Sequence, residues 1–378
     1  MNNALVVGGS NGIGLAVAIE LAKENRTVFL VDRREPSVSI PKNIHFIRED
    51  LLITDFKWLD ELDDVNTLFY SAGFGRVAHF DELHYAEIDN SFRVNAIAPF
   101  RILHHFMPRI KSHNPFYCGM MVSIAGRIAS PLFSIYSATK AALFRGIEAI
   151  NTELKISGTP NRITEISPGS IKGTSFNGRE TELDVIKTLA STIICSMKEH
   201  DVLFIPDFED TYRNVIARYS ANHEQFAESS YKYKIEQGRL QTKPQMTIGY
   251  LSGTFDLFHI GHLNMLRRAR QYCDYLVVGV HKDASHKGKE TFIPFEERVE
   301  ILKNIKYVNK VIQSEREDSD VYIKGIVKYD KLFVGSDYKG TERFNRYEEY
   351  FKDKGVEIIY FPYTQGTSST QLRAAIKS

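Results

Sequence analysis

Short runs of apolar, mostly β-branched residues alternate with stretches of helical periodicity along most of this chain, and the alternation limits the folds open to it. Strands separated by helices in this way form βαβ units, whose strands lie parallel in one sheet with helices on its faces. The runs in the first half are Ala4–Val7, Thr27–Val31, Ile44–Ile47, Thr67–Tyr70, Met120–Ser123 and Arg162–Ile166. The sequence therefore predicts an α/β domain with a doubly wound parallel sheet.

The alternation stops and then resumes. From about Tyr212 to Gln245 the chain is polar and helix-compatible, so we expect a first domain over residues 1–240 that ends in a helical linker. A second set of runs begins at Met246 and continues through Tyr275–Val280, Lys331–Val334 and Val356–Phe361. At 378 residues the chain also exceeds what one hydrophobic core usually organises. We expect a second, smaller α/β domain over residues 246–378.

Composition narrows the classes of function. The chain is 43% hydrophobic and 25% charged with a formal net charge of +1, which gives no electrostatic support to binding of nucleic acid or a membrane surface. Three widely spaced cysteines without a CxxC pair fit a reducing, cytoplasmic setting. The N-terminus lacks the features of a signal peptide, and no apolar run approaches the roughly 18 to 20 residues of a membrane-spanning helix.

A glycine-rich turn follows the first predicted strand and opens a helix. Gly8, Gly12 and Gly14 allow a tight turn, and the helix start behind them offers free N–H groups to an anionic pyrophosphate. A merely tight turn is the alternative. Asp32 and Arg33 end the second strand, where an acid can hold a ribose 2′-hydroxyl and an arginine can accept a 2′-phosphate. NAD and NADP both stay open, with a slight preference for NADP.

Tyr136 and Lys140 are four residues apart, so they share one face of a predicted helix. A free tyrosine has a pKa near roughly 10 and needs a nearby cation to act as an acid or base at neutral pH. Lys140 is placed to be that cation, and Ser123 precedes Tyr136 by thirteen residues. The two-residue pattern alone also fits an exposed helix face.

Together these elements resemble the short-chain dehydrogenase/reductase family over roughly residues 4 to 210. The family's Asn-Asn-Ala-Gly element is similar to the run from Tyr70 to Gly73, although Tyr70 replaces an asparagine and Val7 replaces the usual threonine of the glycine loop. The resemblance implies a Rossmann-like domain that binds NADP or NAD. It implies that Ser123 orients a substrate carbonyl and that Tyr136 donates a proton as hydride arrives. Lys140 would then lower the tyrosine pKa and hold the ribose, and Asn95 would support a proton relay. Implied cofactor contacts are Gly8, Ser10, Asn11, Gly12, Ile13, Gly14, Asp32, Arg33, Asp50, Ala72, Gly73, Pro168, Gly169 and Thr174.

The second domain carries two histidines at a predicted helix start, in the run GTFDLFHIGH from Gly253 to His262. Imidazoles at this place, helped by the helix dipole, can both point at a phosphate. A zinc site would need further ligands at a recognisable spacing, so we expect no metal bound by these side chains. Lys287 and Arg298 follow at a separation that suits neutralisation of charge on phosphates, although basic loop residues are often only solvated.

This half resembles the HxGH nucleotidyltransferases. Over about residues 246 to 376 its sequence is most similar to glycerol-3-phosphate cytidylyltransferases. Adenylyltransferases share HxGH, so CTP as the substrate rests on the closer overall similarity, and Mg²⁺ is expected with it. The resemblance implies His259, His262, Lys287 and Arg298 as catalytic residues. Implied nucleotide contacts are Gly253, Thr254, Phe255, His259, His262, Lys289, Asp337, Thr364, Ser368, Ser369 and Thr370. Tyr363 replaces an arginine that the family places near the phosphates.

The two resemblances suggest consecutive steps: reduction of a ketose or aldose phosphate to a polyol phosphate, which then takes CMP from CTP. Ribulose 5-phosphate and CDP-ribitol are one candidate pair, and glycerol, arabinitol and hexitol phosphates stay open. Such CDP-polyols feed teichoic-acid-like or capsular polymers, and both families imply a homo-oligomer, a dimer or tetramer. The alternatives are a cytidylyltransferase with a non-catalytic, cofactor-binding or oligomerising N-terminal module, and two unrelated reactions on one chain.

Overall fold

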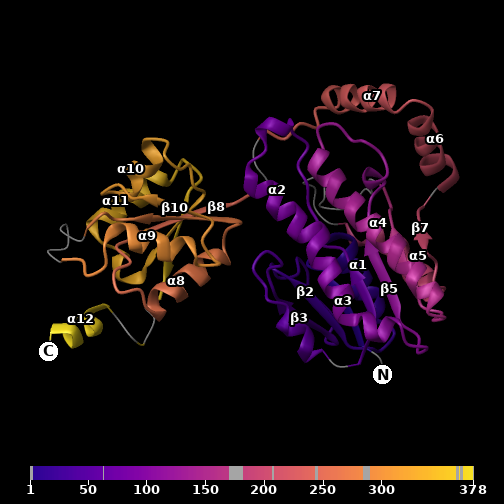
Figure 1. The fold of residues 1–378 in the computed structure, drawn as a ribbon, viewed down its shortest axis with the longest axis horizontal. Coiled ribbons are helices and arrows are strands. Elements are labelled where there is room, and N and C mark those ends of the chain that lie inside the picture. The colour runs from indigo at the N-terminus through magenta and orange to yellow at the C-terminus, as the bar shows by residue number, and fades with distance from the viewer. Residues whose placement is uncertain are drawn as a thin grey trace. The chain divides into compact units, whose positions relative to one another are not determined.

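The computed structural model of the chain describes residues 3–62, 64–169, 182–206, 208–242, 246–283, 290–362, 366 and 369–377. It divides into two compact units, Met1–Gln245 and Met246–Ser378, called here the N-terminal and C-terminal units (Figure 1). Each contains one sheet whose strand pairs are all parallel, which confirms the expectation of two parallel-sheet α/β domains. In the described part of the chain, no helix is both long and apolar enough to cross a bilayer.

The sheet of the N-terminal unit has seven strands in the order β3-β2-β1-β4-β5-β6-β7. Their bounds are β1 Asn3–Val7, β2 Val28–Asp32, β3 Ile44–Arg48, β4 Val65–Tyr70, β5 Tyr117–Met121, β6 Ile163–Ile166 and β7 Leu203–Phe204. Val7 at the end of β1 pairs with Val31 on one side and Tyr70 on the other. The direction of winding reverses between β1 and β4, and in open parallel sheets ligands bind outside the strand ends at such a reversal.

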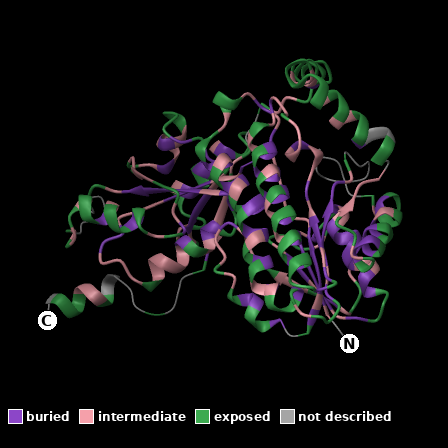
Figure 2. Cartoon of the chain, turned by 45° about the vertical axis from the view of Figure 1, so that its right-hand side comes forward, coloured by how far each residue is buried: buried purple, intermediate pink, exposed green. Residues whose placement is uncertain are grey.

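Alternation along the strands builds two cores, one on each face of this sheet. Leu5 and Val7 pack with α3 and α4, whereas Ala4 and Val6 pack with α1 and α5, because successive side chains of a strand point to opposite faces. Figure 2 shows the strands as the buried centre of the unit, between helices that expose their outer faces. These helices are α1 Gly12–Ala22, α3 Ala98–Ile110, α4 Ser134–Ile156 and α5 Leu183–Lys198.

A π-helical turn joins α2 to α3. The turn covers Arg93–Ile97 between α2, Tyr85–Phe92, and the start of α3. Such insertions are rare and are found mostly at functional sites. Short 3-10 helices cover Lys57–Glu61, Phe80–Glu82 and Ile124–Gly126.

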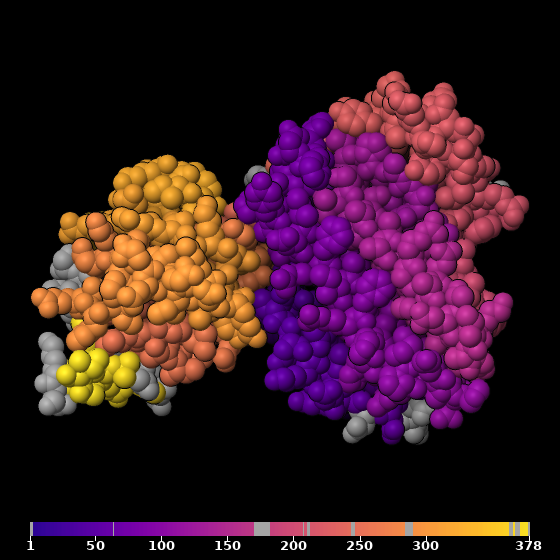
Figure 3. All heavy atoms as spheres, in the orientation of Figure 1, coloured from indigo at the N-terminus to yellow at the C-terminus, as the bar shows by residue number. Residues whose placement is uncertain are grey.

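The stretch expected as a linker consists of helices that belong to the N-terminal unit. A π-helical turn at Phe208–Arg213 leads into α6, Asn214–Ala221, and α7, His223–Glu236. Figure 3 shows their atoms on the outer surface of that unit.

The C-terminal unit repeats the plan with five strands in the order β10-β9-β8-β11-β12. Their bounds are β8 Ile248–Gly253, β9 Tyr275–Val280, β10 Lys310–Gln313, β11 Lys331–Gly335 and β12 Glu357–Phe361. The helices are α8 Ile260–Arg270, α9 Phe295–Lys303, α10 Asp318–Ile323, α11 Glu342–Phe351 and α12 Ser369–Lys377, with a 3-10 turn at Ser336–Tyr338. The winding reverses between β8 and β11, so the end of β8 is the expected ligand edge.

Most strand ends lie within two residues of the sequence-based ranges, and three strands differ more. β7 and β10 were not expected, and β5 covers Tyr117–Met121 rather than Met120–Ser123. Gly119 interrupts the apolar pattern of β5, and the strand packs closely there, because an added Cβ would lie 2.6 Å from Met197 Sδ. Ser123 lies beyond the strand because it caps the 3-10 turn that follows.

Candidate functional sites

Close packing fixes the turn between β1 and α1. Gly8 has a φ of +83°, and a Cβ there would lie 2.3 Å from the backbone nitrogen of Ala72. A Cβ on Gly14 would lie 2.2 Å from the carbonyl oxygen of Gly8. Gly12, with a φ of +57°, has no described atom within 4 Å of its Cβ position. The turn is closely packed around Gly8 and Gly14 and has free space next to Gly12 at the start of α1, where a phosphate can bind.

Asp32 organises the same turn from the end of β2. Its carboxylate accepts hydrogen bonds from the backbone nitrogens of Ser10 at 3.0 Å and Arg34 at 3.2 Å. Asn11 directly precedes α1 and Ile13 lies in its first turn, so these predicted contacts gather at one strand edge. Arg33 is exposed beside Asp32, which keeps both residue types available to a ribose or its phosphate.

The other predicted cofactor contacts follow further strands. Asp50 comes after β3 and accepts a hydrogen bond from the Leu52 nitrogen at 2.9 Å, a turn contact that a structural aspartate also makes. Ala72 and Gly73 follow β4. Pro168 and Gly169 follow β6, and Thr174 lies outside the described residues.

Asn95, in the π-helical turn, is fully buried and joins two parts of the candidate site in the N-terminal unit. Its Nδ2 donates to Phe74 O at 2.8 Å and to Thr139 Oγ1 at 3.0 Å, while its Oδ1 accepts from the Phe74 nitrogen at 3.0 Å. Thr139 precedes Lys140 on α4. Asn95 therefore fixes the segment after β4 against the helix that carries Tyr136 and Lys140.

Tyr70 strengthens the same junction. The tyrosine that replaces the family's asparagine is fully buried, and its hydroxyl donates to Val94 O at 2.5 Å, next to Asn95. The departure noted in the sequence thus supplies a hydrogen bond to the π-helical turn.

Ser123 and Tyr136 are hydrogen-bonded to each other. Tyr136 is 8% exposed, and its ring stacks on Phe133 with centroids 4.3 Å apart. Burial raises the pKa of Tyr136 to about 12, and the hydrogen bond from Ser123 opposes that rise. A buried, protonated tyrosine is the form needed to donate a proton.

Lys140 is 3% exposed, and its Nζ donates to Met121 O at 2.7 Å. The ammonium lies 5.7 Å from the Tyr136 ring centroid. Burial lowers the pKa of Lys140 to about 8. For Tyr136, the rise in pKa caused by burial is larger than the lowering caused by the hydrogen bond to Ser123. That Lys140 lowers the Tyr136 pKa stays a prediction.

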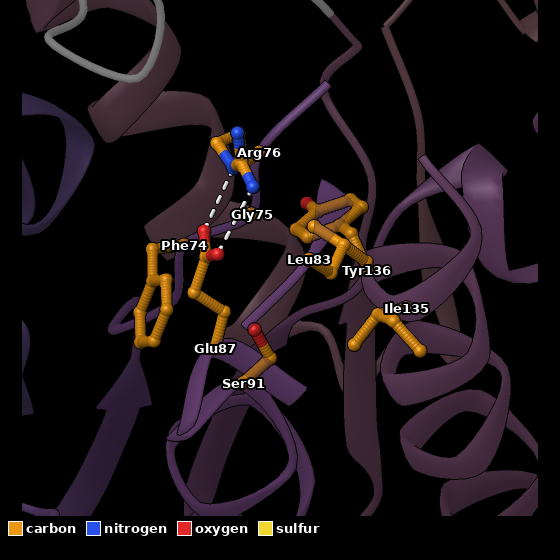
Figure 4. A pocket seen from close by; sticks show the side chains of 8 residues that line it. All are labelled: Phe74, Gly75, Arg76, Leu83, Glu87, Ser91, Ile135 and Tyr136. Atoms are coloured by element: carbon orange, nitrogen blue, oxygen red, sulfur yellow. Dashed lines mark hydrogen bonds and ion pairs between the residues drawn. The ribbon is translucent and has the colours of Figure 1, made fainter. Parts of the chain in front are cut away.

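A pocket opens beside Tyr136 (Figure 4). It is lined by Phe74, Gly75, Arg76, Leu83, Glu87, Ser91, Ile135 and Tyr136. Arg76 and Glu87, each 7% exposed, form a two-pronged ion pair in it, with N···O distances of 2.7 and 3.0 Å. Neither residue was predicted from the sequence. Glu87 carries one usable signal, since it completes the capping box that opens α2.

The C-terminal site begins where β8 turns into α8. His259 caps the helix, and its Nδ1 accepts from the Gly261 nitrogen at 3.0 Å. Burial lowers the pKa of His259, which favours the neutral ring with its hydrogen on Nε2. The ring of His262 stacks on His259 with centroids 4.0 Å apart. The structure thus brings the two predicted imidazoles together at the positive end of α8.

Asp256 lies in the run from Gly253 to His262 and was not among the residues predicted for the site. It is 3% exposed and accepts hydrogen bonds from the backbone nitrogens of Phe292 at 3.1 Å and Ile293 at 3.0 Å. It also forms an ion pair with Arg373 of α12. The sequence did offer a signal for Asp256, because it is the one carboxylate in the run GTFDLFHIGH and lies between aromatic residues.

Arg298 is 1% exposed and binds the backbone of segments around this site. It donates to Ile293 O at 2.9 Å, His281 O at 2.9 Å and Lys282 O at 2.7 Å, and also to Thr254 O at 2.5 Å. These carbonyls belong to three separate segments around the motif. The described contacts are those of a residue that holds loops in place, and a direct role in catalysis stays a prediction.

The remaining predicted contacts lie around the same edge. Gly253, Thr254 and Phe255 form the turn after β8, and Asp337 is exposed just after β11. Gly366 lies near the start of α8, because its Cβ position lies 3.8 Å from Ile260 Cγ2. Ser369 and Thr370 begin α12. Outside the described residues lie Lys287, Lys289, Tyr363, Thr364 and Ser368.

The described residues contain no cluster of side chains suited to bind a metal ion. No group of three or more histidine, cysteine, aspartate or glutamate residues there is arranged to hold a metal ion.

Comparisons with known proteins match both units. The short chain dehydrogenase family model matches residues 2–184, and the Cytidylyltransferase-like model matches residues 250–375. A glycerol-3-phosphate cytidylyltransferase of Bacillus spizizenii is 39% identical over 131 residues, covering 33% of this chain and 94% of that protein. One of Bacillus subtilis is 36% identical over 129 residues, covering 33% and 92%. A short-chain dehydrogenase structure from Streptomyces avermitilis covers 63% of this chain and 98% of its own, with 19% identity and a TM-score of 0.50, a likeness of fold alone. Both resemblances predicted from the motifs are confirmed.

Proposed function

This chain belongs to the short-chain dehydrogenase family in its N-terminal unit and to the cytidylyltransferase-like family in its C-terminal unit, and we propose that the two units catalyse consecutive steps. In the first, a ketose or aldose phosphate, NAD(P)H and a proton give a polyol phosphate and NAD(P)⁺. In the second, the polyol phosphate and CTP give a CDP-polyol and pyrophosphate. The observation that carries the proposal is that Asn95, Ser123, Tyr136 and Lys140 are all present and each is held by hydrogen bonds, Ser123 and Tyr136 to each other, on a chain that also carries the His259/His262 pair.

The reductase chemistry rests on proton handling by buried side chains. When bound, the nicotinamide dinucleotide supplies the hydride. Tyr136 is protonated at neutral pH, since burial raises its pKa to about 12, so it can give its phenolic proton to the carbonyl oxygen. Ser123, already hydrogen-bonded to Tyr136, is placed to hold the same oxygen. Burial lowers the pKa of Lys140 to about 8, so it is still a cation at pH 7 and can stabilise the tyrosinate that remains.

The transferase chemistry rests on positioning and charge. Attack of the polyol phosphate on the α-phosphate of CTP builds negative charge on the phosphates, and fixed donors stabilise it. His259 and His262 stand at the start of α8, where the helix dipole adds to their effect. We propose Mg²⁺ as the accompanying cation, held mainly by the triphosphate, as is usual for nucleotide enzymes.

Two finer points belong to the same proposal. The adjacency of Asp32 and Arg33 supports use of either dinucleotide, with Arg33 as the contact for a 2′-phosphate. CDP-ribitol, CDP-glycerol and related CDP-polyols are the candidate products, and surface-polymer synthesis is their proposed use. We also propose a homo-oligomer, as the resemblance to both families implies.

The competing function is a cytidylyltransferase whose N-terminal unit only binds cofactor or joins subunits. Such a module would need the glycine turn but not a tyrosine held by Ser123, nor a buried lysine held by Met121 O. Keeping Lys140 in the interior is costly, which favours a catalytic use of the residue.

The test is an assay of both half-reactions with the purified full chain. It is supplied with NADPH or NADH, CTP and Mg²⁺, together with ribulose 5-phosphate, dihydroxyacetone phosphate or other sugar phosphates. Absorbance follows the dinucleotide, and a coupled assay follows pyrophosphate. We expect one sugar phosphate to support both signals, with pyrophosphate release depending on prior reduction. If no ketose or aldose phosphate supports NAD(P)H oxidation, the coupled function is wrong.

Two variants separate the units. Tyr136→Phe removes the donated proton and should abolish reduction, while pyrophosphate release from CTP and added ribitol 5-phosphate or glycerol 3-phosphate continues. His259→Ala should do the reverse. Loss of both activities in either variant would contradict two independent sites.

A further inference from the structure

The segment after β7 returns to the reductase pocket through a buried lysine. In α7, all of which the structure describes, Lys234 is the one buried residue. Its Nζ donates to Ser130 Oγ at 2.8 Å and to Pro131 O at 2.7 Å. The Phe133 nitrogen in turn donates to Ser130 O at 3.0 Å, and the ring of Phe133 stacks on Tyr136. The helix is thus attached by polar contacts to the loop that leads into Tyr136.

A second attachment lies just beyond α7. The backbone nitrogen of Gln241 donates to Val77 O at 2.9 Å, and Arg76 Nη1 donates to Gln241 O at 2.9 Å. Both backbone groups of Gln241 therefore bind neighbouring residues of the segment after β4. That segment is the other wall of the pocket in Figure 4.

The two walls of the pocket are the segment after β4 and the loop that leads into Tyr136. They are hydrogen-bonded to each other, and the first packs tightly against Tyr136. The Ala78 nitrogen donates to Leu132 O at 2.8 Å, which bridges the loops. A Cβ on Gly75 would lie 2.7 Å from both Cβ and Cδ2 of Tyr136. A shift of Arg76 would therefore move the pocket wall against the catalytic tyrosine.

Arg76 is suited to anchoring rather than to holding a substrate phosphate. Its Nε and Nη2 donate to Glu87, and Nη2 donates again to Glu82 O at 2.8 Å. With the Gln241 carbonyl bound as well, most of its donors are used and its charge is balanced by a buried carboxylate. Removing one member of such a pair leaves an uncompensated buried charge.

We propose that residues 237–242 are a working part of the reductase site: by binding Arg76 and Val77 they fix the pocket wall against Tyr136, and Arg76 is a positioning residue for the carbonyl substrate. The chain leading into the transferase thereby shapes the reductase pocket. The kinetic side of this inference rests on the proposed reduction, and the structural side does not.

The sharpest perturbation is Gln241→Pro in the full chain, because proline removes the amide that binds Val77. Gln241→Ala is the matched control, since it keeps both backbone groups. Hydrogen exchange of the Ala78 amide, which bridges the walls, needs no substrate. We expect about tenfold faster exchange in the proline variant and parent-like exchange in the alanine variant.

Kinetics with NADPH and ribulose 5-phosphate distinguish positioning from general damage. We expect Gln241→Pro to raise KM about tenfold while kcat changes less than about twofold. Faster exchange with unchanged KM would overturn the positioning role, and unchanged exchange would overturn the whole inference. If the parent chain reduces no sugar phosphate, the proposed function fails, whereas the exchange result still decides whether residues 237–242 hold the wall.

A second pair of variants tests Arg76 itself. Arg76→Met leaves Glu87 buried without its partner and should lower the unfolding midpoint, while Arg76→Met with Glu87→Met should largely restore it. We expect KM for ribulose 5-phosphate to stay raised in both. Recovery of KM together with stability would reduce Arg76 to a structural residue. Because Glu87 also lines the pocket, this result is compared with that of Gln241→Pro, which leaves both side chains in place.

Discussion

Replacing Lys140 with methionine measures what a buried catalytic cation costs this fold. Lys140 is 3% exposed, and burial lowers its pKa from 10.5 to about 8. Between those two values the unfolded chain keeps a proton that the folded chain has released. The free energy of unfolding therefore rises with pH across this window. Methionine does not titrate, so Lys140→Met lacks that rise.

The size of the effect follows from the two pKa values. At about pH 7 the lysine is protonated in both states, and the lowered pKa corresponds to a cost on the order of 3 kcal/mol. At about pH 9.5 roughly 1 kcal/mol of that cost remains. The difference in unfolding free energy between parent and variant should therefore shift by about 2 kcal/mol toward the parent. Met121 O loses its partner in the variant at either pH, so that contribution cancels.

The chain's single tryptophan gives a selective assay. Trp58 is 7% exposed in a core of the N-terminal unit, so its fluorescence reports the urea unfolding of that unit. The control is Lys155→Met, which removes an exposed lysine of the same helix. A difference between parent and Lys140→Met that moves by less than about 0.5 kcal/mol would refute the reasoning. So would an equal movement for the control.

Three further predictions use the same assays. Tyr70→Phe removes the hydroxyl that binds Val94 O and should lower the free energy of unfolding by about 1 to 2 kcal/mol; an unchanged Trp58 midpoint would show that the bond contributes nothing. Asp256→Ala removes the ion pair with Arg373 and the hydrogen bond from the Phe292 amide, so it should slow pyrophosphate release at least about tenfold with NAD(P)H oxidation unchanged. Equal loss of both activities would point to general unfolding. Arg33→Ser should lower kcat/KM for NADPH about tenfold relative to NADH, and a constant ratio would remove Arg33 from cofactor choice.

Periodicity predicts most of the fold, and it fails where a strand lacks an apolar run. β10 begins with exposed Lys310 and ends with exposed Gln313, because it is an edge strand with little to bury. β7 is a two-residue edge strand, too short for any pattern. Central strands such as β1 and β9 are buried on both faces and give a continuous signal.

The site divides in the same way between local and non-local information. Ser123, Tyr136 and Lys140 can be predicted from the sequence because each occupies a fixed place in a motif near a strand end or on a helix. The ion pairs Arg76–Glu87 and Asp256–Arg373 are not, since their members are 11 and 117 residues apart and meet only once the fold brings their segments together. For Arg298 the sequence identifies the residue but not that it donates to backbone carbonyls.

The bond between Arg76 and Gln241 also sets an order of events on the ribosome. The two residues are 165 positions apart, so at about 5–20 residues per second the arginine is made roughly 10 to 30 seconds before its partner. Glu87 is made soon after Arg76. The hydrogen bond that fixes the pocket wall needs Gln241, which is made only when translation nears the start of the second unit. A nascent chain stalled in the helices before Gln241 would carry a reductase with its sheet and catalytic residues already made and its substrate pocket still unsecured.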